Sequence, residues 1–501
     1  MQNQFNSSST PSTGSGSAPP VFILDVGTRT IKAGLHTSSA PHLTPSVVGT
    51  PKYPRCLPRP SPAVVSSQSD LVVGLEARRQ RGLLRLSYPV QNGGAIGDWE
   101  SARPLLRQSV QSALATSSSA NGGGGSVAHA LLGDKTEVIY SLVESPFASR
   151  PQRARLAEVL FESPEKSTRV GPRAAGVFCG VGPLLALYAT GQITGLVVDV
   201  GDGGVSTAAA VDGYVVPLCM QHDVSGASGS AMTAYLRRLL YQGGVLGPVA
   251  AAAARSNVSS LSSIVPGLAC SSPHNLSRGA SAGTAQEQEL VYDIKEACCS
   301  VSAAPLVFPH ATASAASATT PTVLELNSAL LSAARQAQHL AVENASSAAA
   351  ASHSYTLPDG GAIHVSAADA VQAAEVCFYP ALLGLEGPGV VDAVLNAVAA
   401  APADVQSKLL GNIVLTGGAT RCPGFGKRVF RELQQRVDAG GATSGLRGQR
   451  VCVTAPEHRA HAGWLGACFV AQLSSFVSHM VVTRSAYEEE GETALAKRVL
   501  T

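Results

Sequence analysis

Short apolar runs separated by glycine-rich turns organise the stretch from Gly195 to Pro217. The first run ends in Asp199, a tight turn follows over Gly201–Gly204, and a second run over Val205–Val211 leads into Asp212-Gly213. The pattern predicts a strand, a turn, a second strand, a hairpin turn and a third strand. Glycines in such a turn let backbone N–H groups converge on an anion, and an acidic residue at the strand end can hold a hydrated divalent cation beside it. The stretch therefore contains the parts of a site for nucleotide phosphates.

A similar arrangement occurs earlier, from Val21 to Leu35. An apolar run ends in Asp25-Val26-Gly27, a turn follows over Thr28–Thr30, and the next run carries Lys32. Two copies of one strand-turn-strand unit predict two similar domains that face each other across a cleft. Each aspartate also has a structural alternative, because this residue type stabilises turns without any ligand.

Periodicity in the rest of the chain predicts a mixed α/β protein. Buried strands are expected at Val138–Val143 and Ile413–Leu415. Asp98 is expected to cap a helix that begins at Trp99 and is interrupted by Pro104. Further helices are expected at Pro151–Phe161, Val181–Thr190 with Gly191 as its C-cap, Ser230–Leu240, Glu287–Cys299, Lys427–Val437 and Gly463–Phe476.

Several segments have the composition of loops or disordered chain. Residues 1–20 are rich in Ser, Thr, Gln, Gly and Pro, which predicts a disordered tail rather than a signal peptide, and Thr116–Ser126 is expected to be a Ser/Gly linker. Pro51–Asp70 is rich in proline and serine, which excludes a central strand and predicts an exposed loop. Low-complexity insertions are expected at about residues 243–285 and 301–322.

Composition and charge narrow the class of protein. The chain has 501 residues, of which 45% are hydrophobic and 14% charged, and at roughly 100–200 residues per domain it has room for several domains. The net charge of +2 indicates no general polyanion-binding surface, so no direct nucleic-acid partner is expected. The 10 cysteines lack any Cys-x-x-Cys pair, as expected in a reducing compartment without a zinc site. No apolar run approaches the roughly 20 residues that span a bilayer, so we expect a soluble intracellular protein.

Beyond the two turns, the sequence resembles the actins and actin-related proteins in segments that occur in the order an actin would place them. These segments are Thr44–Gly49, Val72–Gly93, Leu187–Gly195, Asp293–Cys299, Tyr355–Gly361, Asn412–Gly426, Ala455–His458, Gly463–Phe476 and Ala486–Gly491. Within the family, RGLL, RARLAEVLFE, LYATG and the YEEEG tail are most similar to centractin, the actin-related filament subunit of dynactin. The resemblance implies an α/β fold of the actin-like ATPase type, in which two similar ribonuclease-H-like domains face each other across a nucleotide cleft.

The resemblance also implies a division into four actin subdomains. Subdomain 1 would comprise residues 21–46, 89–189 and 462–501, subdomain 2 residues 47–88, subdomain 3 residues 190–224 and 386–461, and subdomain 4 residues 225–385 with the insertions. In actin, subdomain 2 carries a loop that grips the next subunit of the filament. Here Pro51–Asp70 replaces that loop almost completely, and a solvated linker without a contact role is an equal alternative.

The family's ligand is ATP or ADP with Mg²⁺, and by resemblance Asp25 and Asp199 would hold the magnesium through water. Contacts to the nucleotide would come from Gly27, Thr28, Arg29 and Lys32 at the phosphates, Gly201, Asp202 and Gly203 opposite them, Lys295 and Glu296 at adenosine and ribose, and Gly417, Gly418 and Arg459 around the adenine. Arg29 stands where actin has a glycine, Cys422 where it has an aromatic residue, and Ala227 where it has an arginine. Some nucleotide affinity is therefore expected to be lost.

Hydrolysis requires a group that positions the attacking water in line with the γ-phosphate. A Gln and a His do this in actin, and the corresponding positions here are Gly182 and Ser206. Gly182 has no side chain, and Ser206 has only a short one. We therefore expect nucleotide binding with very slow or no turnover.

Three classes of function follow from these observations. The first is a structural subunit of a cytoskeletal assembly, in the cytoplasm and in contact with other actin-family subunits, as in a dynactin-type filament. The second is a nuclear actin-related subunit of a chromatin-remodelling complex, which the insertions and the two replaced residues favour. The third, an enzyme such as a sugar kinase or chaperone ATPase, would need a catalytic carboxylate or substrate domain that the sequence does not reveal.

Overall fold

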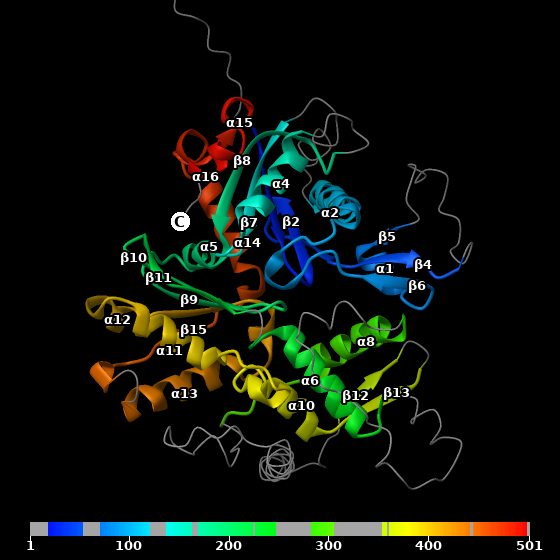
Figure 1. Ribbon diagram of the computed structural model, residues 1–501, viewed down its shortest axis with the longest axis vertical. Helices are drawn as coiled ribbons and strands as arrows, with labels where there is room; N and C mark the ends of the chain where they lie inside the picture. The colour runs from blue at the N-terminus through cyan, green and yellow to red at the C-terminus, as the bar shows by residue number, and fades with distance from the viewer. Residues whose placement is uncertain are drawn as a thin grey trace, which may run out of the picture.

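The computed structural model describes residues 19–53, 71–120, 137–162, 169–223, 226–246, 282–304, 353–357, 360–440 and 444–497. Most of the predicted tail, of the Pro51–Asp70 loop and of the two insertions lies outside these residues. The described chain forms two large sheets with helices on their faces (Figure 1). We call the six-stranded sheet, a small three-stranded sheet and their helices the first lobe, and the five-stranded sheet with its helices the second lobe.

The first lobe is built on a sheet of order β16-β8-β7-β1-β2-β3. Side chains of β1 alternate between two cores: Phe22 and Leu24 pack on the face with α2 and α4, whereas Val21 and Ile23 pack on the opposite face. This alternation is the period-2 pattern that makes the segment a strand buried on both sides. The strands are β1 (Val21–Val26), β2 (Thr30–Leu35), β3 (His42–Pro45), β7 (Glu137–Glu144), β8 (Arg173–Val181) and β16 (Val482–Thr483).

Helix α2 (Trp99–Ala120) corrects two sequence-based expectations. Asp98 Oδ1 accepts hydrogen bonds from the amides of Glu100 and Ser101, as expected of an N-cap, but the helix continues through Pro104 without interruption. Pro104 removes one helical hydrogen bond, whereas the helix buries a long apolar stripe against the sheet, and the stripe decides the outcome. The same helix includes residues 116–120, although we expected a linker over Thr116–Ser126. Helix α4 (Arg150–Phe161) packs beside it on β8.

The second lobe contains a sheet of order β11-β10-β9-β14-β15. The predicted hairpin turn is present, since Asp212 and Gly213 both have positive φ, at 52° and 84°. Strand β11 continues well beyond the predicted Val216, because its later residues still pair with β10 after a bulge. The strands are β9 (Gly195–Val200), β10 (Val205–Val211), β11 (Tyr214–Asp223), β14 (Ile413–Thr416) and β15 (Val453–Thr454).

Helices α5 (Gly182–Ala189) and α14 (Ala462–Ala471) lie between the two sheets. Helix α14 packs on β1 and β7, helix α5 packs on β9 and β10, and the two helices pack closely on each other. Gly466 makes this approach possible, because a Cβ there would lie only 1.7 Å from the carbonyl oxygen of Leu185. The predicted helix Gly463–Phe476 ends at Ala471, and a π-helical turn, η8 (Phe476–Met480), follows it.

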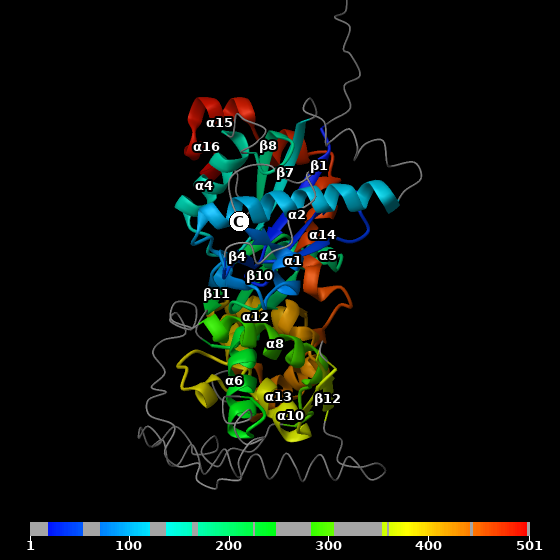
Figure 2. The same ribbon diagram turned by 90° about the vertical axis from the view of Figure 1, so that its right-hand side faces the viewer.

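The remaining helices of the second lobe cover the other face of its sheet and form its outer part (Figures 1 and 2). Helix α8 begins at Ala282, earlier than predicted, so the end of the first insertion was placed too late. The outer part also contains a two-stranded hairpin, β12 (His353–Thr356) and β13 (Ala362–Val365). The helices are α6 (Gly229–Gln242), α8 (Ala282–Cys298), α10 (Ala367–Glu375), α11 (Val390–Ala400), α12 (Ala403–Leu410) and α13 (Phe425–Ala439).

The small sheet of the first lobe has the order β5-β4-β6, and α8 of the second lobe packs against its strand β6. Pro51 ends the central strand β4 (Val48–Pro51), although the sequence had excluded such a strand there. The position tolerates proline because β5 pairs only with Val48 and Gly49. The other elements around the small sheet are β5 (Val72–Val73), α1 (Gly74–Arg79) and β6 (Leu84–Ser87). Helices α15 (Arg484–Glu490) and α16 (Glu492–Lys497) pack on the six-stranded sheet and on α4. Within the described residues, no helix is both long and apolar enough to cross a bilayer.

Candidate functional site

The turn between β1 and β2 places Asp25 and Lys32 side by side. They are cross-strand partners, and Lys32 Nζ lies 2.7 Å from Asp25 Oδ2. Gly27 has no room for a side chain, since a Cβ would lie 2.8 Å from the carbonyl oxygen of Thr30. Its own carbonyl accepts a hydrogen bond of 2.8 Å from Ser46 Oγ. The register of the two strands therefore fixes both charges.

The turn between β9 and β10 presents the second aspartate. Asp199 pairs with Thr416 on the neighbouring parallel strand, and Thr416 Oγ1 donates a 3.1 Å hydrogen bond to Asp199 Oδ1. The amide of Gly201 donates to the carbonyl of Gly204 over 2.9 Å and closes the tight turn, in which Gly203 is buried. Both turns thus carry their aspartate at the end of a central strand.

The two turns meet through Lys32. Burial alone would lower the pKa of Lys32, but Asp25 and then Asp199 raise it above its ordinary value. Burial raises the pKa of Asp199; Lys32 and the hydrogen bond from Thr416 oppose this shift, and the charge of Asp25 adds to it. Two carboxylates that repel each other, and a lysine that attracts both, provide the oxygen ligands and the balance of charge that a water-coordinated divalent cation and phosphates require.

Lys295 and Asp202 form a second charged pair close to the same turn. Lys295 Nζ donates to the carbonyl of Gly229 over 2.9 Å and lies 3.7 Å from Asp202 Oδ1. That carboxylate oxygen is buried, and among the described residues it has no hydrogen-bond partner. Burial lowers the pKa of Lys295; the charge of Asp202 opposes this shift, and the charge of Arg29 adds to it. A buried oxygen without a partner is the expected sign of a ligand or water position. Glu296, the next residue of α8, is exposed.

Gly417 and Arg459 complete the side of the second lobe. Gly417 has a φ of 93°, and a Cβ there would lie 2.3 Å from the carbonyl oxygen of Val200 and 2.5 Å from Asp199 Oδ1. Its amide donates to the carbonyl of Arg459 over 3.0 Å, whereas the Arg459 side chain donates to nearby backbone carbonyls. A Cβ on Gly418 would meet no atom within 4 Å, so this residue borders open space. Gly417 is therefore required by close packing, whereas Gly418 is not.

Arg29 and Thr28 do not point their side chains to the two aspartates. The Arg29 guanidinium forms a two-point ion pair with Glu289 of α8, with 2.6 Å between Nη2 and Oε2, and lies 3.7 Å above the ring of Tyr292. Thr28 Oγ1 donates to the carbonyl of Gln91 over 3.0 Å. Glu289 and Tyr292 were missed from the sequence. The only available signal was the run of acidic residues before Lys295, because Glu289 lies 260 positions from its partner.

The residues at the junction between the lobes fit a magnesium nucleotide at its phosphate end. One lysine pairs with Asp25 and is attracted by Asp199, a buried oxygen of Asp202 lacks a hydrogen-bond partner among the described residues, and Gly27 and Gly417 stand where a Cβ would collide with the backbone. Among the residues that the structure describes, no group of three or more His, Cys, Asp or Glu could ligate a metal directly. Asp25 and Asp199 carry the oxygen ligands that a hydrated divalent cation prefers.

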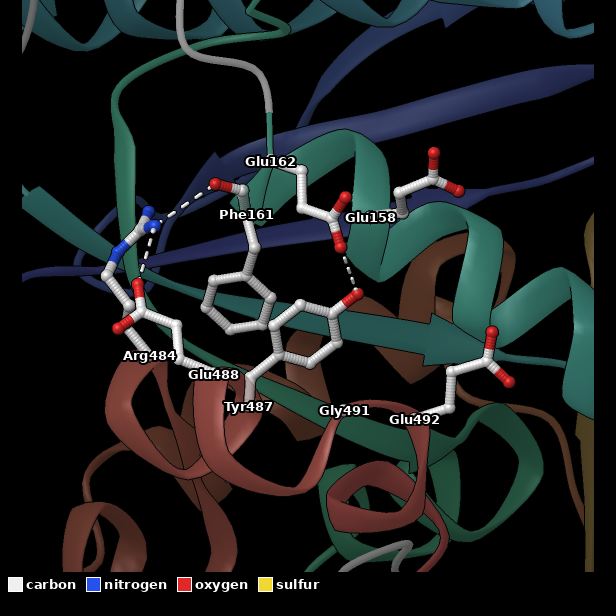
Figure 3. Close-up of a pocket in the computed structure, with 8 residues that line it drawn as sticks. All are labelled: Glu158, Phe161, Glu162, Arg484, Tyr487, Glu488, Gly491 and Glu492. Carbon is white, nitrogen blue, oxygen red and sulfur yellow. Dashed lines mark hydrogen bonds and ion pairs between the residues drawn. The ribbon is translucent and has the colours of Figure 1, made fainter.

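A separate pocket of about 640 Å³ lies between α4 and α15 (Figure 3). The rings of Phe161 and Tyr487 stack at 4.6 Å, and the Tyr487 hydroxyl donates to Glu162 over 2.8 Å. Four glutamates and a single arginine line this pocket, and none of the predicted site residues does. Its negative charge makes it unsuitable for phosphates, so the junction between the lobes remains the candidate site.

One comparison with known proteins bears on the whole chain. The family model described as Actin matches residues 16–500. The match covers both lobes and every predicted site residue.

Proposed function

The chain belongs to the actin family and has an actin-like ATPase fold, and from this premise we propose that it is a structural subunit that binds ATP or ADP with Mg²⁺ and hydrolyses it very slowly or not at all. The observation that carries the proposal is the convergence of Asp25, Lys32 and Asp199 from two lobes that the sequence separates by more than a hundred residues. Members of this family generally bind adenine nucleotides with a divalent cation at this place.

We assign the roles as follows. Asp25 and Asp199 hold the magnesium through water, and Lys32 neutralises both them and the phosphates. A magnesium ion held there would supply positive charge to offset the negative charge of the phosphates. The remaining residues of the proposed site are Gly27, Thr28 and Arg29 of the first turn, Gly201, Asp202 and Gly203 of the second, and Lys295, Glu296, Gly417, Gly418 and Arg459 toward the nucleoside.

The proposal of slow turnover rests on two positions, Gly182 and Ser206. Gly182 is the first residue of α5, and Ser206 lies directly opposite Asp199 in the β9–β10 pairing. Neither residue carries a long polar side chain that could orient a water molecule. Removal of one preorganised hydrogen-bond donor from an active site costs about 2.7–4 kcal/mol of transition-state stabilisation, or roughly 10²–10³ in rate, and we expect a loss of similar order here.

A calorimetric titration with ATP and Mg²⁺ tests the binding proposal. We expect wild-type protein to bind and Asp199→Asn to lose most of its affinity. Asp212→Asn, a change of the same chemistry in the exposed hairpin turn at the other end of β10, should bind like wild type. Absence of binding by wild-type protein would refute the proposal, and an actin-like rate of phosphate release would refute its slow-turnover part.

We further propose that the protein serves in a cytoskeletal assembly with other actin-family subunits, with a dynactin-type filament as the nearest candidate. The centractin-like segments of the sequence support this assignment. Localisation of a tagged copy tests this assignment. We expect a cytoskeletal pattern that coincides with that of dynein. A nuclear pattern would instead favour the alternative, an actin-related subunit of a chromatin-remodelling complex.

A further inference from the structure

Helix α8 of the second lobe is attached to the first lobe by a group of ion pairs. We define the interlobe cluster as Arg29, Arg78 and Arg81 of the first lobe with Glu289 and Asp293 of α8. Arg78 Nε lies 2.9 Å from Glu289 Oε2, Arg78 Nη2 lies 2.5 Å from Asp293 Oδ1, and Arg81 Nη1 lies 3.0 Å from Asp293 Oδ2. Three arginines from two different segments thus converge on two carboxylates of one helix.

Glu289 is the centre of the interlobe cluster. Its side chain is 0% exposed, and it pairs with Arg29 and Arg78 and accepts a 2.7 Å hydrogen bond from the hydroxyl of Tyr88. Burial alone would raise the pKa of Glu289, but Arg29 and the other partners bring it below its ordinary value. These partners offset the cost of burying the carboxylate, and separation of the lobes would break all three of its contacts at once.

Arg29 connects the interlobe cluster to the proposed nucleotide site. It lies two residues after Gly27, in the turn that would face the phosphates. Its guanidinium is nevertheless occupied by Glu289 and by the ring of Tyr292, which also carries Lys295 Nζ at 3.8 Å. To contact a phosphate, Arg29 would have to leave Glu289.

We infer that the interlobe cluster ties the two lobes together in the absence of nucleotide and competes with phosphate for Arg29. In this arrangement the Glu289 carboxylate is the partner of Arg29, in the place that a phosphate would otherwise take. The nucleotide-free chain therefore keeps its lobes closed. The competition rests on the proposed nucleotide site, whereas the tie between the lobes does not.

Hydrogen exchange of the nucleotide-free, full-length protein tests the tie. We expect Glu289→Gln to speed amide exchange in α8, α1 and β6 by about tenfold or more, because loss of the ion pairs makes opening of this junction easier. A tenfold change in the opening equilibrium corresponds to about 1.4 kcal/mol. The matched control is Glu287→Gln on the same helix, because Glu287 pairs with Arg237 inside the second lobe, at 2.8 Å. The control should leave exchange in α1 and β6 unchanged. Equal effects of the two variants on these elements would overturn the inference.

A second variant covers the case in which Glu289→Gln does not fold. Asp293→Asn removes the pairs with Arg78 and Arg81, and its side chain is 22% exposed, so no fully buried charge is left unpaired. We expect faster exchange in α1 and β6 here as well, and unchanged exchange there would count against the tie.

Calorimetry with ATP and Mg²⁺ then separates this inference from the proposed function. If wild-type protein binds no nucleotide but Glu289→Gln speeds exchange, the tie stands and the proposed function fails. If wild-type protein binds nucleotide and Glu289→Gln binds it several-fold more tightly, the competition is supported. Unchanged or weaker binding by a folded Glu289→Gln variant would refute the competition.

Discussion

The substitution Arg428→Met should destabilise the second lobe more than most single changes. Arg428, on α13, has a side chain that is 0% exposed. Its guanidinium forms two bonds of 2.8 Å to Glu375, one of 2.5 Å to Glu432, and further bonds to the carbonyls of Ser302 and Ala304. Methionine has a similar length but would remove the cation that two buried carboxylates, Glu375 and Glu432, share.

The expected loss in the free energy of unfolding follows from the burial of Arg428. Removing one partner of a buried ion pair costs about 3–5 kcal/mol, because the remaining charge stays in a poorly solvated place. Removing all three charges with apolar residues of similar volume is often nearly neutral. The triple variant Arg428→Met, Glu375→Met, Glu432→Leu should therefore recover most of the stability that Arg428→Met loses.

The assay is chemical denaturation with a probe of the second lobe, and α13 itself supplies the control. Arg436, two turns along the helix, pairs with Asp392, and their side chains are 41% and 39% exposed. Arg436→Met should cost at most ~1 kcal/mol, because exposed pairs contribute little. If Arg428→Met and Arg436→Met had equal effects, or if the triple variant were no more stable than Arg428→Met, the reasoning would be refuted.

Three further predictions concern packing, turnover and pH. Gly466→Ala would place a Cβ 1.7 Å from a carbonyl oxygen of α5, so in chemical denaturation it should lower the free energy of unfolding by at least the ~1–3 kcal/mol typical of overpacking. Gly418→Ala, whose Cβ would meet no atom within 4 Å, should be nearly neutral. The double change Gly182→Gln, Ser206→His should raise phosphate release by about tenfold or more, which is ~1.4 kcal/mol of barrier, and no increase in a nucleotide-binding variant would contradict the proposed cause of slow turnover. Because the pKa of Glu289 is lowered in the folded protein, its stabilising effect is present above its ordinary pKa, about 4.3, and is lost as the pH falls below that value. The stability difference between wild type and Glu289→Gln should therefore shrink below about pH 4, and a difference that grows there would show that the sign is wrong.

Local chemistry in the sequence was sufficient for the strand-turn-strand units. The apolar runs, the glycine turns and the aspartates at the strand ends predicted β1–β2 and β9–β10 correctly, including the hairpin at Asp212-Gly213. These features depend on residues within a few positions of each other, so they can be predicted from the local sequence. The family followed from these units together with the further actin-like segments between Thr44 and Gly491, and the match over residues 16–500 confirms it.

Element boundaries were less predictable where packing opposes local preference. Pro104 was expected to interrupt α2, but the buried Leu105, Leu106 and Val110 hold the helix on the sheet. Burial of such side chains contributes about 1.5–3 kcal/mol each, against ~3 kcal/mol for an interior proline. The predicted helix Gly463–Phe476 was too long, since α14 ends at Ala471, before the polar residues Gln472, Ser474 and Ser475.

The sequence by itself determined which residues carry charge at the two turns, and the tertiary structure decided their partners. Asp25 and Lys32 could be paired from the sequence, because they face each other across one short turn. Arg29 was expected at the phosphates, yet its guanidinium pairs with Glu289, 260 positions away. A charge is satisfied by whichever opposite charge the fold brings within a few ångströms, and that distance depends on how two lobes pack rather than on any local pattern.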